Sequence, residues 1–144
     1  FGLIVLSEIA SRALSPAVND PGTAIAVIEA GARVLRRIVD HQADVAALPH
    51  RVHVPPVHLA DLLDDWCRPI GRDGAALVEV GIRLQKALGS LAIHAEGART
   101  LIRRAAQDAA ERAKTALTSE AARSQSMQDF YGRAMIFPRF SGQP

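Results

Sequence analysis

The stretch ALSPAVNDPGTA, Ala13–Ala24, decides the fold because it ends one helical pattern and starts another. Pro16 disfavours the α conformation at Ser15, so the first helix is expected to end there. Asp20 followed by Pro21 is a strong helix start. The aspartate accepts hydrogen bonds from free N–H groups, and a proline in the first helical position has no N–H to leave unpaired. The stretch therefore predicts a tight turn between two helices, the helical counterpart of a hairpin.

Outward from this turn, small or apolar residues recur at steps of three and four, the spacing of one helix face. Before the turn the stripe is Leu3, Leu6, Ala10 and Ala13, and after it the stripe is Ile25, Ile28, Ala32, Leu35 and Val39. The opposite face of the second helix carries Glu29, Arg33, Arg36, Arg37 and Asp40. Both patterns are typical of amphipathic helices that pack against a core.

The rest of the chain predicts three more helices and one extended segment. A short helix is expected from His58 to about Cys67, ended by Pro69, Gly71 and Gly74. The next is expected to open at Asp73-Gly74, with a stripe of Leu77, Gly81, Leu84, Leu88 and Leu91. A long alanine-rich helix follows from about Ala95 to Leu117, with Gly97 as a break and Arg104, Asp108 and Arg112 as a ladder of charges. Pro55 and Pro56 limit the region near 51–55 to at most one short extended segment.

Composition favours helices over sheets. Apolar residues make up 49% of the 144 positions, whereas aromatic residues make up only 4%. A sandwich or barrel would draw more heavily on aromatic and β-branched residues. We therefore predict an all-α, single-domain bundle of five or six helices over residues 1–117, followed by a polar linker and an aromatic-rich tail over 118–144.

The charge and the apolar runs exclude several classes. The net charge of 17 − 15 = +2 is too small for a protein that binds a polyelectrolyte, and the arginines of the second helix lie past its first turns. We predict no nucleic-acid partner. No stretch has the roughly 18 consecutive apolar residues of a spanning helix, and the opening FGLIVL has no basic segment before it. We expect a soluble fragment of a longer chain.

Five residues of the turn are the ligand or interface candidates: Ser15, Asn19, Asp20, Pro21 and Thr23. Each also has a structural use, since Asp20 caps a helix and Asn19 tolerates a left-handed conformation. As a site, the turn would repel an anion because Asp20 already supplies negative charge. A cation, a polar ligand or a partner's backbone is the better fit, and both interpretations stay open.

Other groups predict no chemistry. His50, His53 and His58 have no cysteine or carboxylate beside them at metal-ligand spacing. Cys67 is expected to be a buried structural thiol and cannot form a disulfide within the chain, since it is the only cysteine. Asp61, Asp64 and Asp65 resemble a carboxylate cluster, but Asp61 and Asp65 are expected one turn apart on a solvent-facing side. We predict no catalytic residue, no metal and no cofactor.

The tail differs from the rest in composition. A polar segment precedes DFYGRAMIFPRF, which holds four of the chain's aromatic residues: Phe130, Tyr131, Phe137 and Phe140. We expect these side chains to dock on a second copy, on the membrane-proximal part of the parent protein or on another partner. The alternative is that they fold back onto the core.

The opening residues resemble a known family. After FGL, the chain carries ALSP, NDP and TA at the spacing of bacterial predicted membrane proteins of the domain of unknown function 2254 family. It departs from that pattern with Ala17 for the usual glycine and Gly22 for the usual aromatic residue. Weaker likeness continues from Val54 and fades after about Leu117.

This resemblance implies several transmembrane helices followed by a soluble C-terminal region, of which the present chain is the helical end. The parent would lie in the bacterial inner membrane with this domain on the cytoplasmic side. We therefore expect a non-catalytic domain that acts in assembly, gating or partner binding. Its partners would be the missing membrane segment and a second copy in a homo-oligomer. The alternative is a small-ligand sensor or enzyme that uses the Ser15–Thr23 turn.

Overall fold

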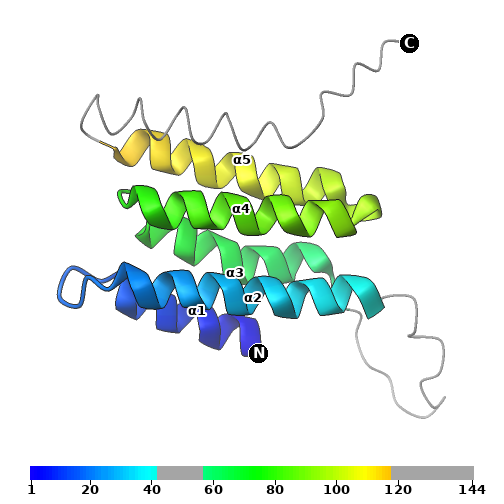
Figure 1. The fold of residues 1–144 in the computed structure, drawn as a ribbon, viewed down its shortest axis with the longest axis horizontal. Coiled ribbons are helices and arrows are strands. Elements are labelled where there is room, and N and C mark those ends of the chain that lie inside the picture. Colours follow the sequence, from blue (N-terminus) through cyan, green and yellow to red (C-terminus); the bar gives the residue numbers. More distant parts are fainter. Residues whose placement is uncertain (42–56, 118–144) are drawn as a thin grey trace.

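The computed structural model describes residues 1–41 and 57–117, and these ranges contain five α-helices (Figure 1). They are α1 (Gly2–Ala13), α2 (Pro21–His41), α3 (Leu59–Asp73), α4 (Val78–His94) and α5 (Arg99–Ala116), with a short 3₁₀ turn, η2 (Glu96–Ala98), before α5. No strand occurs in the described ranges, so the all-α prediction is confirmed. The extended segment expected near 51–55 lies outside them.

Consecutive helices run in opposite directions, so α2 and α4 are parallel to each other (Figure 1). The packing order differs from the chain order. α1 packs on α2 and α3, α4 packs on α2 and α5, and α5 also packs on α3. The five helices thus form a closed ring in the order α1, α2, α4, α5, α3. Each helix turns one face inward, which explains the amphipathic pattern.

The ring encloses one contiguous hydrophobic core. The largest fully buried side chains are Trp66, Ile28, Leu35, Leu63, Ile70, Leu84, Leu88, Ile102 and Val80. Ser7 is the one buried polar residue in the described part of the chain, and its hydroxyl donates to the Ile4 carbonyl over 2.8 Å. A buried hydroxyl that finds a backbone acceptor within its own helix avoids the cost of an unpaired polar group.

The expected end of the third helix is wrong, because α3 continues through Pro69 to Asp73. A proline inside a helix removes one hydrogen bond and costs roughly 3 kcal/mol. Here the neighbouring side chains outweigh that cost, since Trp66 and Ile70 are completely buried. The carbonyl that loses its partner belongs to Asp65, an exposed residue, and can bond to water.

The fourth helix also begins later than expected. Gly74 ends α3, and its N–H donates to the Ile70 carbonyl over 2.9 Å, while α4 starts at Val78. The predicted stripe is confirmed at Leu84, Leu88 and Leu91, which are buried. Leu77 and Gly81 are only half-buried, and Val80 occupies the inner position instead. In the first turn of α4, the buried position is therefore Val80 and not the expected Gly81.

The junction before α5 is confirmed, since α4 ends at His94 and η2 contains Gly97. The expected ladder of charges on α5 does not form within the described residues, where none of the ion pairs joins Arg104, Asp108 and Arg112. Exposed pairs of this kind gain little in water. Asp108 and Arg112 lie beside α3 instead.

Candidate functional site

The turn between α1 and α2 closes through its own backbone. The N–H of Asp20 donates to the Ala13 carbonyl over 2.8 Å, and the N–H of Asn19 donates to the Ser15 carbonyl over the same distance. Asn19 has a φ of 47°, the left-handed conformation that asparagine tolerates. The bond to Ala13 supplies a donor to one of the carbonyls that the end of a helix leaves unpaired. The turn therefore fixes the angle between the two helices.

Asp20 caps α2 with both carboxylate oxygens. Its Oδ1 accepts the backbone N–H of Thr23 over 3.1 Å, and its Oδ2 accepts the Thr23 hydroxyl over 2.6 Å. These hydrogen bonds, the hydroxyl's first, hold the pKa of Asp20 below its ordinary value. Pro21 is the first residue of α2, as expected. The predicted helix start is confirmed.

The structure thus brings the five candidate residues together at one end of the bundle, but they serve largely one another. The Ser15 hydroxyl donates to the Arg12 carbonyl over 2.8 Å, and Asp20 and Thr23 form the cap. The side chain of Asn19 is exposed and has no hydrogen bond among the residues described. The arrangement holds a turn, and Asn19 is the member whose side chain stays available to a partner.

Several other candidates lie outside the described residues. These are His50 and His53 of the possible metal group and the tail candidates Phe130, Tyr131, Phe137 and Phe140. His58 is described and is exposed just before α3. Within residues 1–41 and 57–117, no group of three or more metal-binding side chains comes together.

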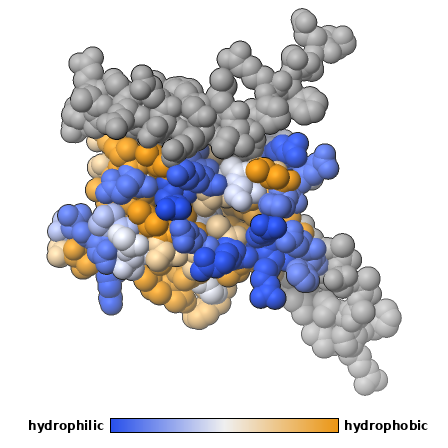
Figure 2. All heavy atoms as spheres, viewed as in Figure 1, coloured by the Kyte–Doolittle hydropathy of each residue, from blue (hydrophilic) through white to orange (hydrophobic). Residues whose placement is uncertain are grey.

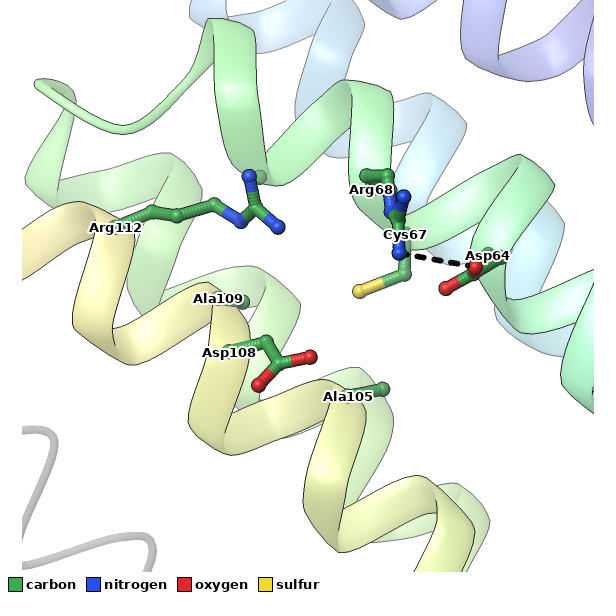
Figure 3. Close-up of a pocket in the computed structure, with 8 residues that line it drawn as sticks. Asp64, Cys67, Arg68, Ala105, Asp108, Ala109 and Arg112 are labelled. Carbon is green, nitrogen blue, oxygen red and sulfur yellow. Dashed lines mark ion pairs between the residues drawn. The ribbon is translucent and has the colours of Figure 1, made fainter.

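Cys67 lies in a narrow cavity of about 20 Å³ between α3 and α5 (Figure 3). Asp64 and Arg68 line it from α3 and form an ion pair of 3.1 Å, while Asp108 and Arg112 line it from α5. Burial raises the pKa of the Cys67 thiol to about 12, and the negative charge of Asp64 adds to this. The thiol is therefore protonated at neutral pH and a poor nucleophile, as a structural cysteine should be.

A larger groove of about 300 Å³ lies between α2 and α4. Arg33 and Arg36 line it from α2, and Arg83 and Lys86 line it from α4. Glu29 also lines it and pairs with Arg83 across the two helices at 3.0 Å. Sequence reasoning placed the α2 charges on one face but missed this groove, because nothing in the sequence indicated that α4 would pack beside them.

Taken together, the fold and these features define an all-α domain with a capped turn and charged grooves between its helices. The sequence pattern of a family described as predicted membrane protein (DUF2254) matches residues 1–90. This covers more than half of the chain, and the chain belongs to that family. The match ends within α4, earlier than the likeness to about Leu117 expected from the sequence. No curated protein and no solved structure matches the chain.

Gly22 leaves room for the cap at the turn. A Cβ at this position would lie 3.2 Å from Oδ1 of Asp20. Glycine leaves the cap more room than a side chain would. Among the residues described, no helix is both long and apolar enough to cross a membrane.

Proposed function

We propose that this chain is a non-catalytic assembly domain of a bacterial membrane protein, soluble and on the cytoplasmic side, which pairs with a second copy through α1. The helical domain would span residues 1–117. The observation that carries the proposal is the outer face of α1, which has an exposed isoleucine on each side. Ile4 and Ile9 are 40% and 45% exposed and lie about 140° apart around the helix. They therefore border this outer face on its two sides, with the half-buried Val5 and the exposed Glu8 between them. The inner face of α1 already packs in the core, so this outer face is a second packing surface.

The charges on α1 support a second copy as the occupant. Glu8 and Arg12 lie one turn apart on the exposed face, and neither joins an ion pair within the described part of the chain. A two-fold axis that sets two α1 helices antiparallel places Glu8 of each copy against Arg12 of the other. One surface then supplies both halves of each pair. Since the outer face of one short helix is a small surface, we expect a weak, concentration-dependent dimer.

The polar groups support assembly over catalysis. Both carboxylate oxygens of Asp20 are engaged by Thr23, and the Ser15 hydroxyl is engaged by α1. The Cys67 thiol is protonated and buried. A general base or nucleophile needs a free atom within reach of a substrate. This favours assembly over the alternative of a ligand sensor or enzyme that uses the turn.

Analytical ultracentrifugation of the 144-residue chain over a concentration series tests the proposal. We expect a dimer that Ile4→Glu and Ile9→Glu convert to a monomer with an unchanged circular dichroism spectrum. Ile93→Glu is the matched control, because Ile93 is an exposed isoleucine on α4, 61% accessible, and should leave the dimer intact. A wild-type chain that stays monomeric throughout the series would refute the proposal.

A charge swap tests the geometry of the pair. Glu8→Arg and Arg12→Glu should each weaken the dimer, because each sets like charges opposite one another. The double variant should restore association, since the two positions exchange roles across the two-fold axis. Loss of association in the double variant would exclude the antiparallel arrangement.

A further inference from the structure

The groove between α2 and α4 carries an excess of positive charge that the assembly proposal does not use. Figure 2 shows hydrophilic residues gathered across the face where Figure 1 places α2 and α4. Four cationic side chains line the groove: Arg33, Arg36, Arg83 and Lys86. Glu29 is the one acidic residue in its lining. The cations of α2 and those of α4 thus line the same hollow.

Ion pairing leaves two of these four cationic side chains without a partner among the described residues. Glu29 is taken by Arg83 at 3.0 Å. Arg36 makes only a long contact of 3.6 Å with Asp40, and both side chains are about half exposed. Such a pair contributes little in water. Arg33 and Lys86 have no ion pair among the described residues. The two helices therefore present two free cations across one hollow.

The shape of the groove suits a small anion. Its base contains Ala32 and Ala87, whose short side chains leave the hollow open, and Leu91, which is buried. Ser90 adds an exposed hydroxyl at the rim. A guanidinium offers a planar pair of donors to two oxygens of a phosphate, and an ammonium adds a point charge. Arginine, lysine and serine around one hollow are the chemistry of a phosphate site.

We propose that this groove binds the phosphate of an anionic phospholipid headgroup and docks the domain on a membrane surface. A membrane protein holds its domains near a bilayer, which raises the effective concentration of headgroups and lets a small site suffice. A nucleic acid would need a longer basic surface to track its backbone. This groove is confined to the space between two helices, and the whole chain carries a net charge of only +2.

Co-sedimentation of the 144-residue chain with vesicles tests the proposal. One set of vesicles is phosphatidylcholine alone, and the other contains phosphatidylglycerol as well. We expect binding only to the second set, weakening as salt is added because the contacts are ionic. The double variant Arg33→Gln/Lys86→Gln should reduce that binding at least about tenfold, since it removes both unpaired cations from one site. Circular dichroism checks that these exposed substitutions leave the fold intact.

The matched control removes the same charge elsewhere. Arg37 on α2 and Lys114 on α5 are exposed cations that do not line the groove. Arg37→Gln/Lys114→Gln should keep binding within about twofold of the wild type, because surface charge outside the site acts only through the screened long-range field. Equal loss in both double variants would show attraction by net charge alone and overturn the proposal.

Two further experiments distinguish a lipid headgroup from other molecules that carry phosphate. Inorganic phosphate that raises the melting temperature through Arg33 and Lys86, without any vesicle binding, would assign the groove to a soluble anion and overturn the lipid proposal. Binding of duplex DNA that needs the same two residues, again without vesicle binding, would overturn it as well. Equal binding to both sets of vesicles would remove the role of the anionic headgroup.

Discussion

α3 meets its neighbours through a buried glycine on two sides, and the two contacts differ sharply. On the α2 side, the indole of Trp66 lies directly on Gly31. A Cβ at position 31 would overlap Nε1 and lie 2.6 Å from Cε2. On the α5 side, a Cβ at Gly71 would lie 3.5 Å from the Ala109 Cβ and 3.7 Å from Leu84. The first contact has no space for a methyl group, whereas the second makes ordinary van der Waals contact with one.

The comparison shows that burial does not tell what a helical glycine is for. Gly31 is required by its partner, a completely buried tryptophan whose indole N–H has no acceptor among the described residues. Gly71 lies beside the Cys67 cavity and has room for a side chain. Close packing in protein interiors makes one methyl group decisive at the first contact and harmless at the second.

Gly31→Ala should produce the largest effect at neutral pH. The substitution gains up to about 1 kcal/mol of helix propensity, yet inserting a methyl group into a filled core costs about 1–3 kcal/mol or more. Because the Cβ would overlap the indole, we expect the upper end of that cost and a net destabilisation of about 2 kcal/mol. Urea unfolding followed by fluorescence measures it, since Trp66 is the only tryptophan. Unchanged stability would show that α2 and α3 can separate freely.

A double-mutant cycle assigns that cost to the indole. Trp66→Phe is itself destabilising because it leaves part of the core empty. Gly31→Ala should then cost less in the Trp66→Phe chain than in the wild type, with a coupling of about 0.5–3 kcal/mol between the two positions. Circular dichroism follows unfolding in these chains. If the free-energy costs of the two substitutions simply add, the cost of Gly31→Ala does not come from its contact with Trp66.

On the α5 side of α3, the buried thiol of Cys67 predicts that the stability of the fold depends on pH in the alkaline range. The folded-state pKa of Cys67 is raised to about 12 from an ordinary 9.0, so its contribution to stability is complete below pH 9 and is lost as the pH rises towards 12. The expected slope is about 1.4 kcal/mol per pH unit in that window. The difference between wild type and Cys67→Ala isolates this thiol from the other groups that titrate there. Parallel pH profiles would show that the thiol ionises freely in the folded chain.

Asp20→Ala should have a smaller effect on stability, and Asp20 lies away from both of the glycine contacts. Loss of the N-cap should lower the melting temperature by about 2–6 °C, with the Trp66 emission of the folded state unchanged. The lowered pKa of Asp20 means that its contribution is present above the ordinary carboxyl range and is lost as the pH falls through its folded value. Asp20→Asn keeps an acceptor and should lose less. A melting temperature unaffected by either change would remove the cap as a source of stability.

Gly71→Ala should give the smallest effect, with the opposite sign to Gly31→Ala. Alanine gains about 0.5–1 kcal/mol over glycine inside a helix, and the added Cβ fits. We therefore expect a slightly more stable chain with unchanged fluorescence. A loss of stability would show that the α3–α5 contact is as tight as the α2–α3 contact and would remove the distinction between them.

Local sequence signals predicted the helical hairpin and its cap, because Asp20-Pro21 and the residues that it binds lie within four positions. The predicted end of α3 was wrong because Pro69 is only a local signal, and the burial of its neighbours stabilises the helix beyond it. The predicted inner face of α2 was only partly right, since Ile28 and Leu35 are buried as expected but Gly31 was not included. Gly31 belongs to it through a contact with Trp66 that no periodicity in α2 reveals.

The α2–α4 groove could not be predicted for a related reason. Arg33 and Lys86 come together only because α2 packs beside α4, and the intervening α3 lies across the core. A spacing of three and four places residues on one helix face but does not say which helix comes next to it. Chain order suggests that α2 packs on α3 and α3 on α4, whereas in the ring only α1–α2 and α4–α5 are sequential neighbours.

The ring order also determines where this domain can be cut. The family pattern ends at residue 90, yet α5 is the helix that joins α4 to α3. Ile102 and Ala106 of α5 are buried against them. A chain ended at the family boundary would be an open arc with an uncovered seam. Every copy of such a chain would lack α5, so we expect the truncated molecules to associate with one another through this apolar seam.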